Sequence, residues 1–77
     1  MNNKWKLVSE TPPPCYNSWE GDGLVSDVIL LKDKKGTIYA GECVSGRLDG
    51  RKFMDFYDTE KWEIKDVVYW ASISEYL

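Results

Sequence analysis

The chain has 77 residues, ten of them basic and thirteen acidic, which gives a net charge of −3. This length predicts one small domain, 1–77, whose thin core must be filled largely by its four Trp, five Tyr and two Phe residues. Charges of both signs are interspersed, and there is no basic block of the kind that follows a phosphate backbone. Direct nucleic-acid binding is therefore not expected.

The sequence also argues against a membrane protein and against a metal site. The first residues form no apolar signal peptide, and the longest apolar run, 28–31, is too short to cross a bilayer. We therefore expect a cytoplasmic protein with reduced thiols. Cys15 and Cys43 lie far apart and the chain has no His, which excludes the usual four-ligand zinc sites. Both cysteines are expected to be small buried hydrophobes.

The first third of the chain predicts little regular structure. Residues 5–8 are typical of a short strand. Prolines 12–14 cannot donate to a strand ladder, so they predict a loop or a polyproline segment. Polar residues and glycines continue this irregular loop over about 11–26. Loops of this length in compact domains are often functional.

The middle of the chain predicts a series of strands and turns. Residues 27–32 have a continuous apolar centre, residues 37–44 hold β-branched and aromatic side chains, and the two segments flank a turn at 33–36, which predicts a hairpin. A second turn is expected at 45–50, because Asp49-Gly50 is a strong hairpin signal.

Three further strands are expected, at 52–57, 62–64 and 67–73, with a turn at 58–60. The last residues predict an extended tail or one helical turn, and no helical pattern of ten or more residues is present. We therefore predict an all-β protein, a small antiparallel β-meander of five to six strands, curled or half-barrelled.

Catalytic machinery is missing from the sequence. Without His, Ser-His-Asp and Cys-His arrangements cannot form. Asp58 and Glu60 fall in a predicted turn, which they are expected to cap, and 20–23 is better explained as an acidic turn than as a calcium loop. Phosphate-binding and dinucleotide-binding glycine motifs are absent. We expect no enzyme, no cofactor, no catalytic residue and no metal ligand.

Aromatic residues are candidates for binding. Trp19 and Tyr16 lie in the irregular loop, where each either covers the core or contacts a ligand or partner. Tyr39 and Trp62 lie on predicted strands, of which only one face can line the core.

A basic cluster surrounds the second predicted turn and includes Arg47, Arg51 and Lys52. Such a cluster is either a solvated turn or part of a pocket. A guanidinium group suits phosphate, and a neighbouring aromatic ring suits a base. Arg47 and Arg51 are therefore candidates for binding a nucleotide-type ligand.

Short motifs at both ends of the chain carry a family resemblance. Trp5 and Val8 are followed by Pro13 in the register Trp-x-x-Val with proline five residues later, and the chain closes with Val67-x-x-Trp70. With these motifs the chain resembles a short phage and prophage family, the domain of unknown function numbered five-five-one. The central 28–31 block, with Gly36 and Tyr39 after it, is also similar to that family.

The ending departs from the family pattern. Tyr69 stands where the family has His, and Ser72 and Ser74 stand where it has prolines. The resemblance implies a phage or prophage origin and a compact β fold, with no assigned activity. By analogy, small phage accessory proteins are often inhibitors of host defence.

Three functions remain open. The protein could bind and sequester a small nucleotide-type signal, with its pocket between protomers of a homo-oligomer. Alternatively, it could bind a host defence protein, including a nuclease complex, through a loop or a β edge. A third alternative is a structural or regulatory phage protein.

Overall fold

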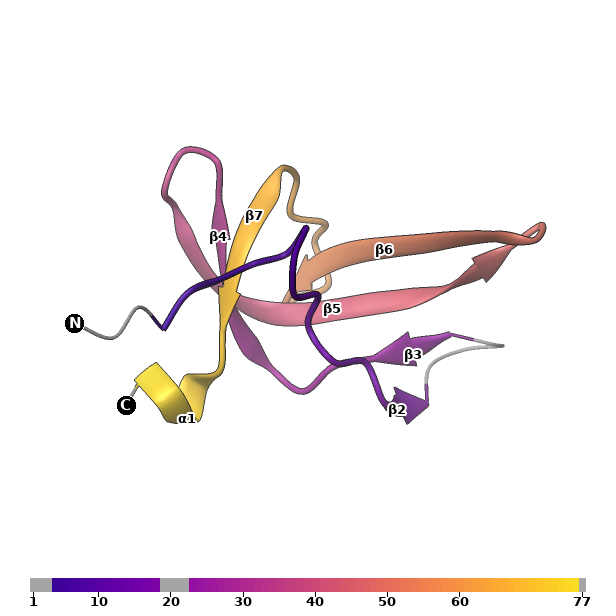
Figure 1. The fold of residues 1–77 in the computed structure, drawn as a ribbon, viewed down its shortest axis with the longest axis horizontal. Helices are drawn as coiled ribbons and strands as arrows, with labels where there is room; N and C mark the ends of the chain where they lie inside the picture. Colours follow the sequence, from indigo (N-terminus) through magenta and orange to yellow (C-terminus); the bar gives the residue numbers. More distant parts are fainter. Residues whose placement is uncertain (1–3, 19–22, 77) are drawn as a thin grey trace.

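A computed structural model describes residues 4–18 and 23–76 of the chain. These residues form one antiparallel sheet with seven strands, followed by a single helical turn (Figure 1). The elements are β1 (Lys6–Leu7), β2 (Asn17–Ser18), β3 (Leu24–Val25), β4 (Ile29–Asp33), β5 (Ile38–Leu48), β6 (Arg51–Asp58), β7 (Val67–Ala71) and α1 (Ile73–Tyr76). Within the described ranges, no helix is long and apolar enough to span a membrane.

The predicted all-β, antiparallel class is confirmed, and the sheet is curled without closing into a barrel. The strand order is β1-β7-β4-β5-β3-β2, with β6 on the other edge of β5. A simple meander of five or six strands would place β7 beside β6. Instead, the connection 59–66 carries the chain back so that β7 pairs with β4.

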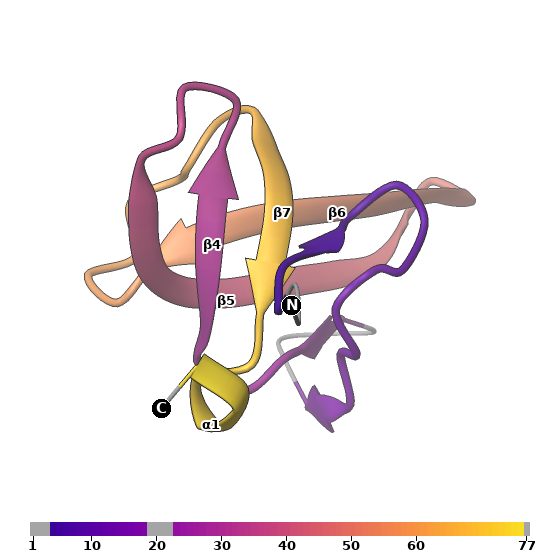
Figure 2. The same cartoon turned by 60° about the vertical axis from the view of Figure 1, so that its left-hand side comes forward.

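The curl of the sheet is concentrated in β5, which Figure 2 shows bending sharply along its length. Its first part pairs with β4, from Ile38 to Gly41, and β6 pairs with it from Gly41 onward. At Gly41 a Cβ atom would lie 2.2 Å from the backbone oxygen of Tyr57. Only glycine allows the strands to approach this closely at the bend.

Strands β3 and β4 lie along the same edge of β5 and are separated by a β-bulge. Ile29 pairs with Gly41, whereas Val25 pairs with Val44, so three residues of one strand face two of the other. The Ser26 hydroxyl fills the gap by accepting a hydrogen bond from the Cys43 N–H at 2.9 Å. The predicted irregular loop 11–26 thus contains the strands β2 and β3, each of only two residues, which is too short to show an alternating pattern.

One face of the sheet carries the hydrophobic core, formed by Ile29, Leu31, Cys43, Phe56, Ile64 and Trp70. The proline-rich segment packs against this face, with Pro13 buried and Cys15 half-buried. The Cys15 thiol donates to the Cys43 carbonyl at 3.3 Å, and the Trp70 indole donates to the Thr11 carbonyl at 2.6 Å. Both cysteines are free thiols; Cys43 is buried as predicted, whereas Cys15 is only half-buried.

The turns agree with the sequence in position but not always in length. Asp49 and Gly50 have φ angles of 52° and 79°, so the second hairpin closes with two residues rather than six. The strand predicted at 62–64 is reduced to an isolated bridge between Tyr57 and Glu63. The chain end forms the helical turn α1.

Candidate functional site

The outer part of the β5–β6 hairpin projects from the body of the molecule (Figure 1). The pairing of β3 with β5 ends at Leu24 opposite Ser45, so the hairpin extends beyond the rest of the sheet. Basic side chains gather here, and those of Arg47, Arg51 and Lys52 are exposed. The predicted basic cluster thus lies on a two-stranded arm.

The register of the hairpin separates the two arginines. Arg47 pairs with Lys52, and Leu48 pairs with Arg51. Residues directly opposite each other share a face, and neighbours along a strand alternate. Arg47 and Lys52 therefore share one face, and Arg51 lies on the other.

The described chain has a pocket of about 510 Å³ and a larger one of about 670 Å³. The larger pocket lies on the hairpin and is lined by Arg47, Lys52 and Phe53, together with Leu24, Ser45, Gly46 and Met54. Its lining contains two cations and no carboxylate. A phosphate or carboxylate group is the ligand chemistry that such a lining favours.

Phe53 is held in place by the glycine opposite it. Gly46 pairs with Phe53, and a Cβ atom on Gly46 would come within 2.9 Å of the Phe53 ring. The ring therefore lies over the backbone at Gly46, half-buried and with part of its surface open to solvent. Because Phe53 follows Lys52 on β6, its ring lies on the face opposite that of Arg47 and Lys52, the face that carries Arg51.

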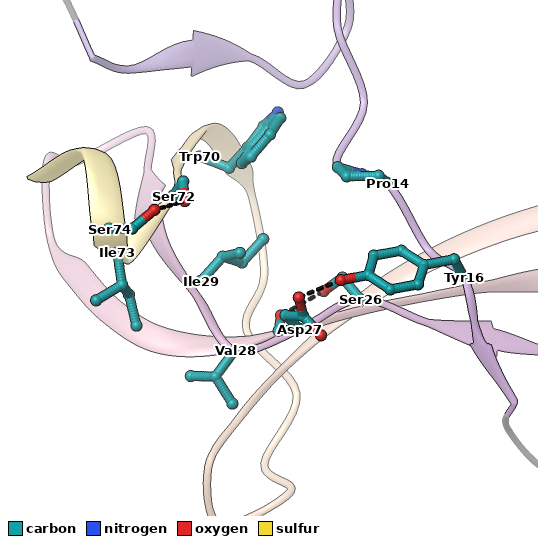
Figure 3. Close-up of a pocket in the computed structure, with 10 residues that line it drawn as sticks. All are labelled: Pro14, Tyr16, Ser26, Asp27, Val28, Ile29, Trp70, Ser72, Ile73 and Ser74. Atoms are coloured by element: carbon teal, nitrogen blue, oxygen red, sulfur yellow. Dashed lines mark hydrogen bonds between the residues drawn. The ribbon is translucent and has the colours of Figure 1, made fainter.

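The smaller pocket lies between the segment before β2, the connection from β3 to β4, and the end of β7 with α1 (Figure 3). Tyr16 and Pro14 border it on one side, and Trp70 and Ile29 on another. Its remaining lining residues are Ser26, Asp27, Val28, Ser72, Ile73 and Ser74. With one carboxylate and no cation, this pocket disfavours a phosphate group.

Asp27 orients Tyr16 at the rim of the smaller pocket. The Tyr16 hydroxyl donates to Asp27 Oδ2, and Asn17 Nδ2 donates to Asp27 Oδ1 at 3.2 Å. These two hydrogen bonds lower the pKa of Asp27, and the same bond to Asp27 raises the pKa of Tyr16. Both groups keep their ordinary charge states at neutral pH, so the pair acts as a fixed contact.

The other predicted aromatic residues do not join the basic cluster. Tyr39 packs against the core, and its hydroxyl donates to Asp33 Oδ2 at 3.1 Å. Trp62 is 71% exposed on the turn after β6, where its backbone N–H bonds to Asp58. Trp19 lies outside the described residues. The described chain therefore does not bring the predicted binding residues into one site.

Phe53 is absent from the residues predicted to bind, although its position can be counted from the turn. A two-residue Asp-Gly turn pairs Leu48 with Arg51, and two steps further it pairs Gly46 with Phe53. Because the sequence predicts a turn at 45–50, it does not predict that Gly46 pairs with Phe53. The signal was the Asp49-Gly50 pair itself.

No group of three His, Cys, Asp or Glu side chains that could hold a metal ion occurs in residues 4–18 and 23–76. Comparison with known proteins gives no match to a family model, to a curated protein or to a solved structure.

Proposed function

We propose that the protein is a small non-enzymatic phage or prophage accessory protein that inhibits host defence by binding and sequestering a nucleotide-type signal. The observation that supports this proposal is the hairpin pocket, in which Arg47 and Lys52 share a face and the lining holds no carboxylate. These cations would hold the phosphate groups of such a ligand. The phage context rests on the family resemblance of the two chain ends.

A protein that works by sequestration needs no reacting group, only an affinity that competes with the host receptor. The described chain suits this role, because its polar clusters, such as Tyr16 with Asp27, serve as structural contacts. A cytoplasmic location in the bacterial host belongs to the same proposal.

The test is calorimetric titration with cyclic di-AMP, cyclic di-GMP, ADP-ribose and inorganic phosphate. We expect at least one of the nucleotides to bind and Arg47→Ala to weaken that binding about tenfold or more, since a charged hydrogen bond is lost. Lys34→Ala is the matched control, because it removes an exposed cation distant from the hairpin. If no nucleotide binds, or if Arg47→Ala binds as tightly as the control, the proposal is wrong.

A second candidate function is direct binding to a host defence protein. The observation that favours it is the 71% exposure of Trp62, since exposed Trp is frequent among residues that dominate protein interfaces. Its test is capture of a host protein by the wild type and loss of that capture in Trp62→Ala. Capture that persists in Trp62→Ala would contradict a role for this residue.

A further inference from the structure

The outer edge of β6 is open over its first half. Near its end this edge is occupied, because Ile64 N–H bonds to the Phe56 carbonyl at 2.8 Å and Asp58 N–H bonds to the Trp62 carbonyl at 2.9 Å. Backbone groups of alternate residues in an antiparallel strand point to the same side. The N–H and C=O groups of Lys52 and Met54 therefore point outward, and no described residue pairs with them.

We propose that a second copy of this chain pairs with this edge, antiparallel, about a two-fold axis at Phe53. Lys52 of each copy then exchanges both backbone hydrogen bonds with Met54 of the other. This register uses the outward N–H and C=O groups of both Lys52 and Met54. Two-stranded hairpins in each protomer become one four-stranded sheet.

Charge complementarity selects this register. With the axis at Phe53, Arg51 of each copy lies directly opposite Asp55 of the other. These are non-hydrogen-bonded pairs, in which side chains approach most closely. Arg51 makes no ion pair within the described chain, and it lies four residues from Asp55 on the same strand, too far for a direct contact.

The neighbouring registers are unfavourable. With the axis at Lys52, two lysines face each other and Asp49 lies opposite Asp55. With the axis at Met54, Lys52 needs the outward backbone groups of Phe56, and Ile64 already occupies the Phe56 carbonyl. Registers with the axis between two residues are excluded. A two-fold axis perpendicular to the sheet maps each face onto itself, whereas these registers would pair residues whose side chains lie on opposite faces.

The dimer would also enlarge the candidate site. Arg47 and Lys52 of both copies fall on the same face of the joined sheet, so the two hairpin pockets become one groove lined by four cations. This step rests on the proposed function. It favours a two-fold symmetric ligand with two phosphates, which is the chemistry of a cyclic dinucleotide.

The experiment is a charge exchange read by sedimentation velocity over a wide concentration range. The wild type should form a dimer. Arg51→Glu and Asp55→Arg should each weaken dimerisation about tenfold or more, because both cross-strand pairs become repulsive. The double variant R51E/D55R should restore it. Lys34→Glu makes the same charge change away from β6 and serves as the control.

A second variant separates the edge from the charges. Met54→Pro removes an N–H that bonds to nothing in the monomer, so the fold should persist while the dimer is lost. Circular dichroism and thermal melting check that each variant is folded. A wild type that stays monomeric, or a dimer that all these variants leave unchanged, would overturn the proposal, as would a different protein on the same edge.

Ligand binding and dimerisation can be tested separately. Arg47→Ala should abolish binding of the cyclic dinucleotides while the dimer persists. A dimer that obeys the charge exchange but binds no cyclic dinucleotide would reject only the ligand assignment. A monomer that binds a nucleotide through Arg47 would reject only the dimer.

Discussion

A single carboxylate organises the turn between β4 and β5. Asp33 Oδ1 accepts hydrogen bonds from the backbone N–H groups of Lys35 and Thr37, both at 2.9 Å, and Oδ2 accepts one from the Tyr39 hydroxyl. Gly36 completes the turn with a φ of 89°. Tyr39, predicted as a binding residue, thus has a structural contact that accounts for its hydroxyl.

Asp33 should make the stability of the fold depend on pH. Partial desolvation raises its pKa, but the hydrogen bonds from Thr37, Tyr39 and Lys35 outweigh this and lower it below the ordinary 3.8. The folded state therefore favours the charged form. Its contribution is complete above pH 3.8 and is lost as the pH falls through the lower folded-state pKa.

We expect the free energy of unfolding of the wild type to fall on acidification in this range, and Asp33→Asn to show a shallower fall. Urea denaturation at several pH values measures both. Asp27, whose pKa is also lowered, contributes equally to the two proteins and cancels in the comparison. Parallel pH profiles for the two proteins would contradict this role of Asp33.

Burial makes the Cys43 thiol unreactive in the folded protein. Its side chain is fully buried, and desolvation, followed by the hydrogen bond with Cys15, raises the pKa of Cys43 far above its ordinary value. The thiolate is the reactive form, so folded Cys43 should resist alkylation. Iodoacetamide treatment with mass spectrometry should label it only after unfolding.

The control for Cys43 is Cys15→Ser, which leaves Cys43 as the sole thiol. In this variant, too, labelling should follow global unfolding. Rapid labelling of Cys43 in the folded variant would show that the core opens locally.

At the scale of elements, the β-bulge joins β3 and β4 into one interrupted edge of β5. Ser26 is 2% exposed, and its hydroxyl accepts from Cys43 N–H and donates to the Asp27 carbonyl at 2.8 Å. The side chain replaces a backbone acceptor that the extra residue has displaced. The bulge also brings Asp27 to the rim of the smaller pocket, beside Tyr16.

Ser26→Ala should destabilise the fold by about 1–3 kcal/mol, because it leaves the buried N–H of Cys43 without an acceptor. Chemical denaturation measures the change. Ser18→Ala, at an exposed position of β2, is the matched control and should change stability by less than about 0.5 kcal/mol. Equal effects of the two substitutions would show that the bulge does not depend on this hydroxyl.

At the scale of the whole molecule, the N-terminal segment packs across the sheet through contacts with residues that are distant in the sequence. Trp70 is buried on β7, and its indole N–H donates to the carbonyl of Thr11, 59 residues away. The segment between β1 and β2 thereby covers core residues that the curled sheet leaves open. Both chain ends thus contribute to one core.

Trp70→Phe should lower the free energy of unfolding by about 1–3 kcal/mol, since it removes the hydrogen bond and part of the packed ring system. Trp62→Phe is the matched control, because Trp62 is 71% exposed and should tolerate the change within about 0.5 kcal/mol. Denaturant unfolding of both variants tests the difference. A larger loss in Trp62→Phe would mean that the exposed ring is a structural contact.

The sequence by itself determined the features that depend on neighbouring residues. Period-two patterns define the antiparallel strands, and Asp49-Gly50 defines a hairpin because only some residues adopt positive φ without strain. The absence of His excludes Ser-His-Asp and Cys-His arrangements regardless of fold. The sequence also places a basic cluster, with Arg47, Arg51 and Lys52, at that hairpin.

Only the tertiary structure decided how distant segments meet. The position of β7 beside β4, the packing of Cys15 against Cys43 and the bulge at Ser26 depend on which surfaces are buried together, and no local preference encodes this. The candidate site shows the same division. A register fixed by the two-residue turn puts Arg47 with Lys52 and turns Arg51 away, because one residue along a strand changes the face of the sheet.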